Sequence, residues 1–325
     1  MDLAAHRLSV AAIERAAQVI APELRDTPQY VCEPLSDALG CRLVVKVETL
    51  GPLRSFKGRG ADFFVHELAA AGPVPQLVCA SAGNFGQGMA YAARRHGAQV
   101  TVYAARTASP LKIERMRALG AAVVLEGRDF DAAKAAARAH AETAGALFAE
   151  DSRQEPITEG AGTIGLELTR LPEPLDAVVV PLGNGAMLNG IARWLRHASP
   201  ATEVIGVVAE GAPAMRDSWR AGHPVEGGAV TTFADGIGVR VPVPEALDDM
   251  RGLVDDVVAI DDAPTLAAMR LGLRHLGIVL EPSAGVGIAA IAAYPGRFAG
   301  RTVATVLCGG NVTADQARDW YGIAG

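Results

Sequence analysis

The chain has 325 residues, half of them hydrophobic, which is enough for a large core and for two lobes. Its formal net charge of -6 is spread over interspersed acidic and basic residues, and this argues against a nucleic-acid partner. The four cysteines, Cys32, Cys41, Cys79 and Cys308, are scattered and form no C-x-x-C pair, so we expect a reduced, cytoplasmic protein rather than a disulfide framework or a metal finger.

The first predicted helix covers about 9–20, and the charges of Glu14 and Arg15 distinguish it from the core of a signal peptide. The apolar runs farther along are too short to cross a bilayer, so no membrane partner is expected. Short β-branched runs predict buried strands at 43–47, 77–79, 100–103, 123–125, 178–180, 205–208 and 303–307. Between them, a 3.6-residue pattern predicts helices at 63–71, 89–96, 113–119, 132–144, 164–169, 188–197 and 266–275.

This alternation predicts an α/β protein of two lobes, each a mostly parallel twisted sheet flanked by helices. Compact strand-helix units fill about 57–146, and the units lengthen after Glu150. We therefore expect a large cofactor-binding domain made of residues 1–50 and 147–325, with a small domain, 51–146, inserted into it. Ligand sites in such sheets lie beyond the carboxyl ends of the strands.

The segment Ser55-Phe56-Lys57-Gly58-Arg59-Gly60-Ala61 follows the first predicted strand. Cationic neighbours, Arg54 and Arg59, and desolvation by nearby aromatic and small residues favour the neutral form of the Lys57 amine. A neutral amine is a nucleophile that forms a Schiff base with a carbonyl, including the aldehyde of pyridoxal phosphate. On local chemistry alone, a solvated or phosphate-facing basic loop is the more common alternative.

A Gly-rich turn, Ser81-Ala82-Gly83-Asn84-Phe85-Gly86-Gln87-Gly88, leads from the second predicted strand into a helix. Backbone amides and short polar side chains at a helix N-terminus form an anion site, suited to a carboxylate or a phosphate. A tight turn without a ligand is an equally good interpretation of this segment.

A second Gly-rich turn covers 181–190, and its Gly183 and Gly185, with Glu210 after the next strand, imitate a dinucleotide-binding fingerprint. Leu188 stands where that fingerprint requires its third glycine, so we favour a monophosphate cradle over a nicotinamide site. The last predicted strand ends in Cys308-Gly309-Gly310-Asn311. Cys308 is either a small buried hydrophobe or a weak, neutral partner of a pyridine nitrogen.

In order and spacing, these motifs together resemble the pyridoxal-phosphate-dependent enzymes of the tryptophan-synthase-β superfamily (fold type II), and within it the serine/threonine dehydratase and serine racemase branch. The matching segments are 55–61, 81–84, 183–187, Glu281-Pro282-Ser283-Ala284-Gly285 and 308–311, with Arg25-Asp26-Thr27-Pro28, Gly160-Ala161-Gly162-Thr163 and Ala234-Asp235-Gly236-Ile237 in support. The resemblance covers nearly the whole chain.

The resemblance implies a role for each site residue. Lys57 holds the cofactor as a Schiff base and acts as the base at Cα. The remaining cofactor contacts are Phe56, Asn84 at the ring hydroxyl, Gly183, Asn184, Gly185, Ala186 and Met187 at the phosphate, Gly236, Glu281 and Cys308 at the ring nitrogen. The substrate is bound by Ser81, Ala82, Gly83, Asn84 and Phe85. A helix N-cap or a solvated loop acid is the alternative for Glu281.

Departures from the family pattern bear on the predicted reaction, the substrate pocket and the cation site. Alanine at position 82 replaces the serine with which a racemase-like relative protonates the opposite face of Cα, so elimination is favoured over racemisation. Phe85 replaces a common histidine and alters the floor of the substrate pocket. Glu210 and Ala214 are candidates for a stimulatory cation, but Arg216 occupies an apparent aspartate position, with Asp217 one residue on, so the metal stays open.

The resemblance therefore implies β-elimination on a β-hydroxy-α-amino acid such as threonine, serine or a bulkier analogue, with the cofactor phosphate as proton donor, giving a 2-oxo acid and ammonia. A homodimer is also expected. The alternatives are β- or γ-replacement as in cysteine-synthase- or threonine-synthase-like enzymes, an amino-acid racemase, a nicotinamide dehydrogenase, and a non-catalytic sensor. The chain ends soon after its last predicted strand, so no appended regulatory domain is expected.

Overall fold

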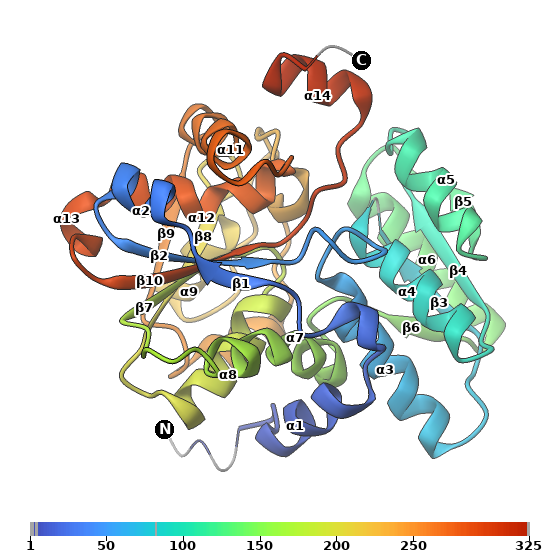
Figure 1. The fold of residues 1–325 in the computed structure, drawn as a ribbon. Helices are drawn as coiled ribbons and strands as arrows, with labels where there is room; N and C mark the ends of the chain where they lie inside the picture. The colour runs from blue at the N-terminus through green and yellow to red at the C-terminus, as the bar shows by residue number, and fades with distance from the viewer. Residues whose placement is uncertain (1–2, 4–5, 82, 324–325) are drawn as a thin grey trace.

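The computed structural model describes residues 3, 6–81 and 83–323, which form two sheets with helices on both faces (Figure 1). The larger sheet has six strands in the order β1-β2-β10-β7-β8-β9, and only the β1–β2 pair is antiparallel. Its strands are β1 (Gln29–Val31), β2 (Arg42–Val47), β7 (Ala177–Pro181), β8 (Glu203–Ala209), β9 (Asp256–Ile260) and β10 (Thr302–Leu307). The predicted α/β class is confirmed.

The second sheet has four parallel strands in the order β5-β4-β3-β6. Its strands are β3 (Leu77–Ala80), β4 (Val100–Ala104), β5 (Ala122–Leu125) and β6 (Leu147–Ala149). We refer to this sheet and its helices as the small lobe and to the remainder as the large lobe. Because β6 pairs with β3, the small lobe continues just past residue 146, where the sequence pattern places the end of the inserted segment.

Helices cover both faces of each sheet, as Figure 1 shows. In the large lobe, α7 and α8 lie on one face and α12 on the other; in the small lobe, α3 and α4 lie opposite α6. The helices are α1 (Val10–Val19), α2 (Glu33–Leu39), α3 (Lys57–Ala71), α4 (Asn84–Arg95), α5 (Pro110–Ala118), α6 (Phe130–Ala144), α7 (Glu155–Leu168), α8 (Ala186–Ala198), α9 (Ala214–Ala221), α10 (Pro244–Met250), α11 (Asp262–Leu276), α12 (Pro282–Ala293), α13 (Pro295–Phe298) and α14 (Ala314–Tyr321), with short 3-10 turns η2 (Pro22–Leu24) and η3 (Asp235–Ile237). Among the described helices, none combines the length and the hydropathy needed to cross a bilayer.

The first turn of α3 packs directly on the backbone of α7 because residue 60 is a glycine. A Cβ atom on Gly60 would lie 2.2 Å from the carbonyl oxygen of Ile157, a distance that no side chain tolerates. Gly60 therefore serves the packing of α3 on α7. This contact fixes the position of the helix that begins at Lys57.

Candidate active site

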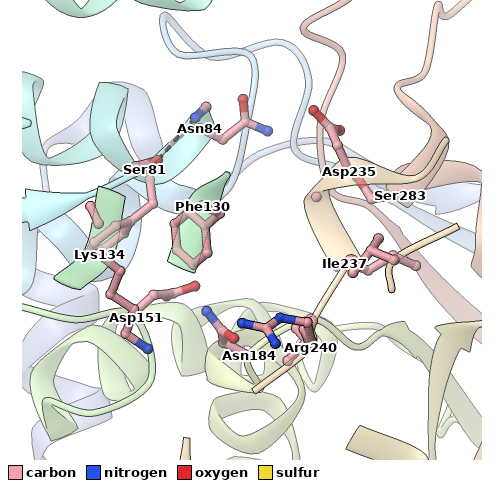
Figure 2. A pocket seen from close by; sticks show the side chains of 18 of the residues that line it. Ser81, Asn84, Phe130, Lys134, Asp151, Asn184, Asp235, Ile237, Arg240 and Ser283 are labelled. Atoms are coloured by element: carbon pink, nitrogen blue, oxygen red, sulfur yellow. Dashed lines mark hydrogen bonds between the residues drawn. The ribbon is translucent and has the colours of Figure 1, made fainter. Parts of the chain in front are cut away.

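A cavity of about 710 Å³ lies between the two lobes, at the carboxyl ends of strands from both sheets. Its wall contains every site residue predicted above that the structure describes, apart from the two candidate metal ligands. Ala82 lies outside the described residues. Figure 2 shows Ser81, Lys134 and Asp151 on one side of the cavity, and Asp235, Ile237 and Ser283 on the opposite side. This is the position at which parallel sheets bind ligands.

Lys57 is the first residue of α3, so its backbone is helical rather than part of a loop. Its Nζ lies 2.5 Å from Oδ2 of Asp151 and 4.7 Å from the centre of the Phe56 ring. The charged group nearest to the amine is thus a carboxylate. The expectation that the guanidinium of Arg59 lies beside Lys57 is wrong.

Arg59 points away from the cavity into a closed network of charges. It is fully buried, and its guanidinium lies 2.5 Å from Oε1 of Glu167 and 2.9 Å from Oε2 of Glu48. Lys46, also fully buried, contacts the other oxygen of Glu167. Burial by itself would raise the pKa of Glu167, but the hydrogen bonds and charges of Arg59 and Lys46 lower that pKa to about 2. Two carboxylates therefore neutralise Arg59, which leaves it no electrostatic role at Lys57.

Asp151 is a cavity residue that the sequence pattern does not reveal. It lies in the turn between β6 and α7, and its side chain is 11% exposed. Gln154 fixes this turn, because its side chain accepts a hydrogen bond from the amide of Glu150 (2.9 Å) and donates one to the carbonyl of Phe148 (3.0 Å). The only signal in the sequence was the change of unit length after Glu150, which locates the turn but not the direction of the carboxylate.

The turn at Ser81 is closed by its own hydroxyl group. Ser81 Oγ accepts hydrogen bonds from the amides of Gly83 (3.1 Å) and Gly86 (2.9 Å). Lys112, a residue that sequence reasoning missed, packs against Gly83 and extends to Asp235 across the cavity, with 2.7 Å between Nζ and Oδ2. Burial opposes the charge of Lys112, but Asp235 and the field of Glu281 outweigh it, so the pKa of Lys112 is raised. A cation thus lies beside the turn, which suits a carboxylate ligand.

Asn84 and Glu281 form a polar network at the inner end of the cavity. Asn84 donates from Nδ2 to Oε1 of Glu281 (2.8 Å) and accepts at Oδ1 from Nδ2 of Asn311 (2.8 Å). Glu281 occupies the N-cap position of α12, but its side chain makes no capping hydrogen bond. Burial raises the pKa of Glu281, and Lys112 and Asn84 offset this only in part. Glu281 is therefore a buried acid rather than the solvated loop acid considered as its alternative.

The turn before α8 forms a cradle with exposed amides. Gly185 adopts a φ of +106°, and α8 begins at Ala186 with no side chain capping its free N–H groups. A Cβ on Gly183 would lie 3.0 Å from the carbonyl oxygen of Gly236, and a Cβ on Gly236 would lie 2.6 Å from Oγ of Ser283. Free helical amides bind a phosphate. The two glycines let the turn, the segment at Gly236 and the start of α12 pack closely together around the cavity.

Cys308 follows β10 and is buried in the wall of the same cavity. Burial raises the pKa of its thiol, so the group is neutral at pH 7. With the amine of Lys57, the cradle at Gly185 and this thiol, the residues fit the pyridoxal phosphate that the sequence resemblance implies.

The candidate cation ligands, Glu210 and Ala214, do not line the cavity. Glu210 Oε2 lies 3.1 Å from Nη1 of Arg216, and Nε of the same guanidinium lies 3.0 Å from Oδ1 of Asp217. An arginine thus occupies the space between the two carboxylates. Within the described part of the chain, no group of three or more His, Cys, Asp or Glu residues is arranged to hold a metal ion.

The fold and the cavity together define an enzyme of the pyridoxal-phosphate-dependent class. The model of the family described as pyridoxal-phosphate dependent enzyme matches residues 20–309, and the chain belongs to that family. The dinucleotide interpretation of the turn at Gly183 is therefore set aside.

Among named proteins, the chain is 35% identical to the L-threonine ammonia-lyase of Thermotoga maritima over 87% of this chain and 70% of that protein. It is 33% identical to the chloroplastic biosynthetic threonine dehydratase of Arabidopsis thaliana, over 90% of this chain but only 50% of that protein. Among solved structures, the processed form of threonine deaminase isoform 2 from Solanum lycopersicum superimposes with a TM-score of 0.89 at 30% identity, over 97% of this chain and 92% of the other.

Proposed function

We propose that the chain is a pyridoxal-phosphate-dependent ammonia-lyase that converts a β-hydroxy-α-amino acid, with threonine and serine as the first candidates, into a 2-oxo acid and ammonia. The observation that carries the proposal is the position of the Lys57 amine in a cavity that also holds an anion cradle and a carboxylate-binding turn. The names of the relatives, threonine ammonia-lyase and threonine dehydratase, support elimination as the reaction.

Each part of the cavity has a task in this reaction. Lys57 holds the cofactor through its amine, and the amides at the start of α8 hold the phosphate. Asn84 and Cys308, both on the cavity wall, would contact the ring. The turn at Ser81, with Lys112 beside it, binds the substrate carboxylate and orients Cα toward Lys57. When bound, pyridoxal phosphate supplies an electron sink for the negative charge that develops at Cα.

Lys57 is the base that removes the proton from Cα once its amine is free. A neutral thiol at Cys308 would not hold a proton on the ring nitrogen of a bound cofactor as an acidic partner would, so the cofactor would supply a weaker electron sink there. Alanine at position 82 offers no proton donor for the opposite face of Cα. Elimination is thus favoured over racemisation.

Purified protein tests the cofactor and its attachment. It is expected to be yellow, to lose that absorbance on borohydride reduction, and to yield a modified peptide that contains Lys57. Incubation with L-threonine, L-serine and 3-phenylserine is expected to release a 2-oxo acid and ammonia in equal amounts. Efficient interconversion of serine enantiomers without 2-oxo acid, or products of β- or γ-replacement only, would contradict the proposed reaction.

We further propose that the protein acts in the cytoplasm as a homodimer, with the segment near 51–146 inserted as a separate domain. The sequence resemblance supports the homodimer, the scattered cysteines support the cytoplasm, and the change of unit length after Glu150 supports the inserted domain. Sedimentation analysis at several protein concentrations measures the oligomeric state, and a single monomeric species throughout would overturn the homodimer.

A further inference from the structure

We propose that Asp151 is the acid that protonates the departing β-hydroxyl group, and that Asp151 and Lys57 work as a pair that shares one proton. This inference rests on the proposed β-elimination. It gives Asp151 the task that the sequence resemblance assigns to the cofactor phosphate.

The first observation is geometric. Oδ2 of Asp151 lies 2.5 Å from Nζ of Lys57, while Oδ1 is buried and has no hydrogen-bond partner among the described residues. Figure 2 shows Asp151 on the wall of the cavity, on the same side as Lys134. Because Oδ1 is enclosed by protein, Oδ2 is the oxygen placed to exchange protons: it lies within hydrogen-bond reach of the base, and the side chain belongs to the cavity wall.

The second observation concerns the neighbouring cations, which are engaged elsewhere. Lys134 and Arg138 both pair with Glu150, the residue before Asp151. Lys112 pairs with Asp235. Lys57 is thus the ion-pair partner of Asp151 in the described structure.

A change in the state of Lys57 therefore changes the state of Asp151. When the Lys57 amine binds the cofactor carbonyl carbon, Asp151 loses its ammonium partner in a site where its side chain is only 11% exposed. A buried carboxylate without a counter-ion is costly, and uptake of a proton removes the cost. The proton that the Lys57 ammonium gives up on binding the cofactor would pass to Asp151, which would then enter the reaction as the acid.

The protons balance over one turnover. The freed Lys57 amine takes the proton from Cα, and the electron pair of that C–H bond forms the Cα–Cβ double bond. The Cβ–O bond breaks with its electron pair on oxygen, which takes the proton of Asp151 and departs as water. Lys57 is then an ammonium and Asp151 a carboxylate, which is the ion pair seen in this structure. As Lys57 rebinds the cofactor, its proton returns to Asp151 and the enamine product hydrolyses to 2-oxo acid and ammonia.

The test compares two leaving groups in the variant Asp151→Asn, which keeps the shape of the side chain but cannot act as an acid. Loss of a general acid lowers turnover of serine by about 100-fold or more. 3-Chloroalanine has a leaving group that needs no proton, so we expect its turnover to fall by less than about 5-fold. An equal loss for both substrates would reduce Asp151 to a positioning residue, and no loss for serine would also overturn the proposal.

A second measurement does not depend on turnover. Infrared difference spectra on addition of pyridoxal phosphate to the apoenzyme are expected to show a new protonated-carboxyl band in the wild type and none in Asp151→Asn. The same band in both proteins contradicts the proposal, even if the enzyme acts on no hydroxy amino acid and the proposed function itself fails. Borohydride trapping at Lys57 and the melting temperature establish that the variant is folded and loaded.

The matched control is Asp129→Asn, which removes one carboxylate from the start of α6 and leaves a side chain that caps a helix equally well. The ratio of the serine and 3-chloroalanine rates is expected to match that of the wild type. A selective loss of 2,3-diaminopropionate turnover in Asp151→Asn, with serine unaffected, would instead identify Asp151 as a carboxylate that recognises a cationic substituent, and would overturn the acid role.

Discussion

Lys57 and Arg59 lie in the same turn of α3 and have opposite surroundings. Arg59 is enclosed by Glu48 and Glu167, and each of its nitrogens has a partner. Lys57 faces a cavity and pairs with one carboxylate, whose second oxygen is buried and has no hydrogen-bond partner in the described part of the chain. A closed set of charges stabilises the fold, whereas an open one leaves capacity for chemistry. Burial and charge alone do not distinguish a structural cation from a candidate catalytic one, whereas complete pairing of the polar atoms does.

The largest effect is expected for Lys57→Ala, which removes the cation that faces the cavity. Loss of both the cofactor attachment and the base should lower 2-oxo acid production by at least about 1,000-fold, while the free energy of unfolding of the apoenzyme changes little. Steady-state assays and urea unfolding measure the two quantities. Retained activity would remove Lys57 from the mechanism, and a large loss of stability would place it with Arg59 as a structural cation.

The substitution Arg59→Met tests the fully paired network of charges around Arg59. It leaves two buried carboxylates without their main cation, so the free energy of unfolding in urea should fall by about 3–5 kcal/mol. The control is Arg15→Met, which breaks an exposed ion pair with Glu67 and should cost at most about 1 kcal/mol. Similar losses in the two variants would show that the Arg59 network contributes no more than a surface pair.

Glu159 in α7 provides an intermediate case, a buried carboxyl group that accepts a hydrogen bond from the amide of Ser9 (2.8 Å) and has no ion-pair partner among the described residues. Burial raises its pKa from 4.5 to about 7. Because this pKa is raised, the folded protein keeps a proton on Glu159 at pH values where the unfolded chain has lost it. The contribution of Glu159 to the free energy of unfolding is therefore full below pH 4.5 and is lost as the pH rises through about 7.

The variant Glu159→Gln mimics the protonated form and should therefore stabilise the protein at pH 8.5 by up to about 3 kcal/mol, with little effect near pH 4.5. Thermal or urea unfolding at the two pH values measures the difference. A destabilisation at pH 8.5 would indicate that the ionised carboxylate has a compensating partner.

The smallest expected effect concerns the cation candidates. The guanidinium of Arg216 lies between Glu210 and Asp217, so both carboxylates already have a cationic partner. Millimolar Mg²⁺ or EDTA should therefore shift the melting temperature by less than about 1 °C. The substitution Arg216→Gln removes the cation between the two carboxylates and should make the melting temperature sensitive to Mg²⁺. A marked Mg²⁺ effect on the wild type would show that a cation binds despite the arginine.

Much of the fold follows from local patterns in the sequence. Each β-branched run predicted as a strand is a strand, but the expected burial of 123–125 is wrong, because β5 is an edge strand whose residues are half-buried or exposed. The strands β1 and β6 are too short to leave a signal, and β9 begins with an acidic residue that obscures its apolar run. Helix α3 begins six residues before the predicted start at 63, because the close approach of Gly60 to α7 is a tertiary effect.

The site follows from the sequence only where a motif carries it. The predicted cofactor- and substrate-binding residues that the structure describes share one cavity, because glycine-rich turns at strand ends are local signals. Lys112 and Asp151 carry no such signal. Their positions depend on the pairing of β6 with β3 and on the approach of the two lobes, and neither can be read from neighbours in the chain.

The route of the chain between the two sheets adds a mechanical consequence. One passage follows β2 and ends at Lys57, and the return passage follows β6 and contains Asp151. A rotation of one lobe against the other would pivot near these two residues, so the outer walls of the cavity would travel far while the 2.5 Å contact between amine and carboxylate moved little. Ligands of different width would then fit between the lobes without a change in the distance between the Lys57 amine and the Asp151 carboxylate.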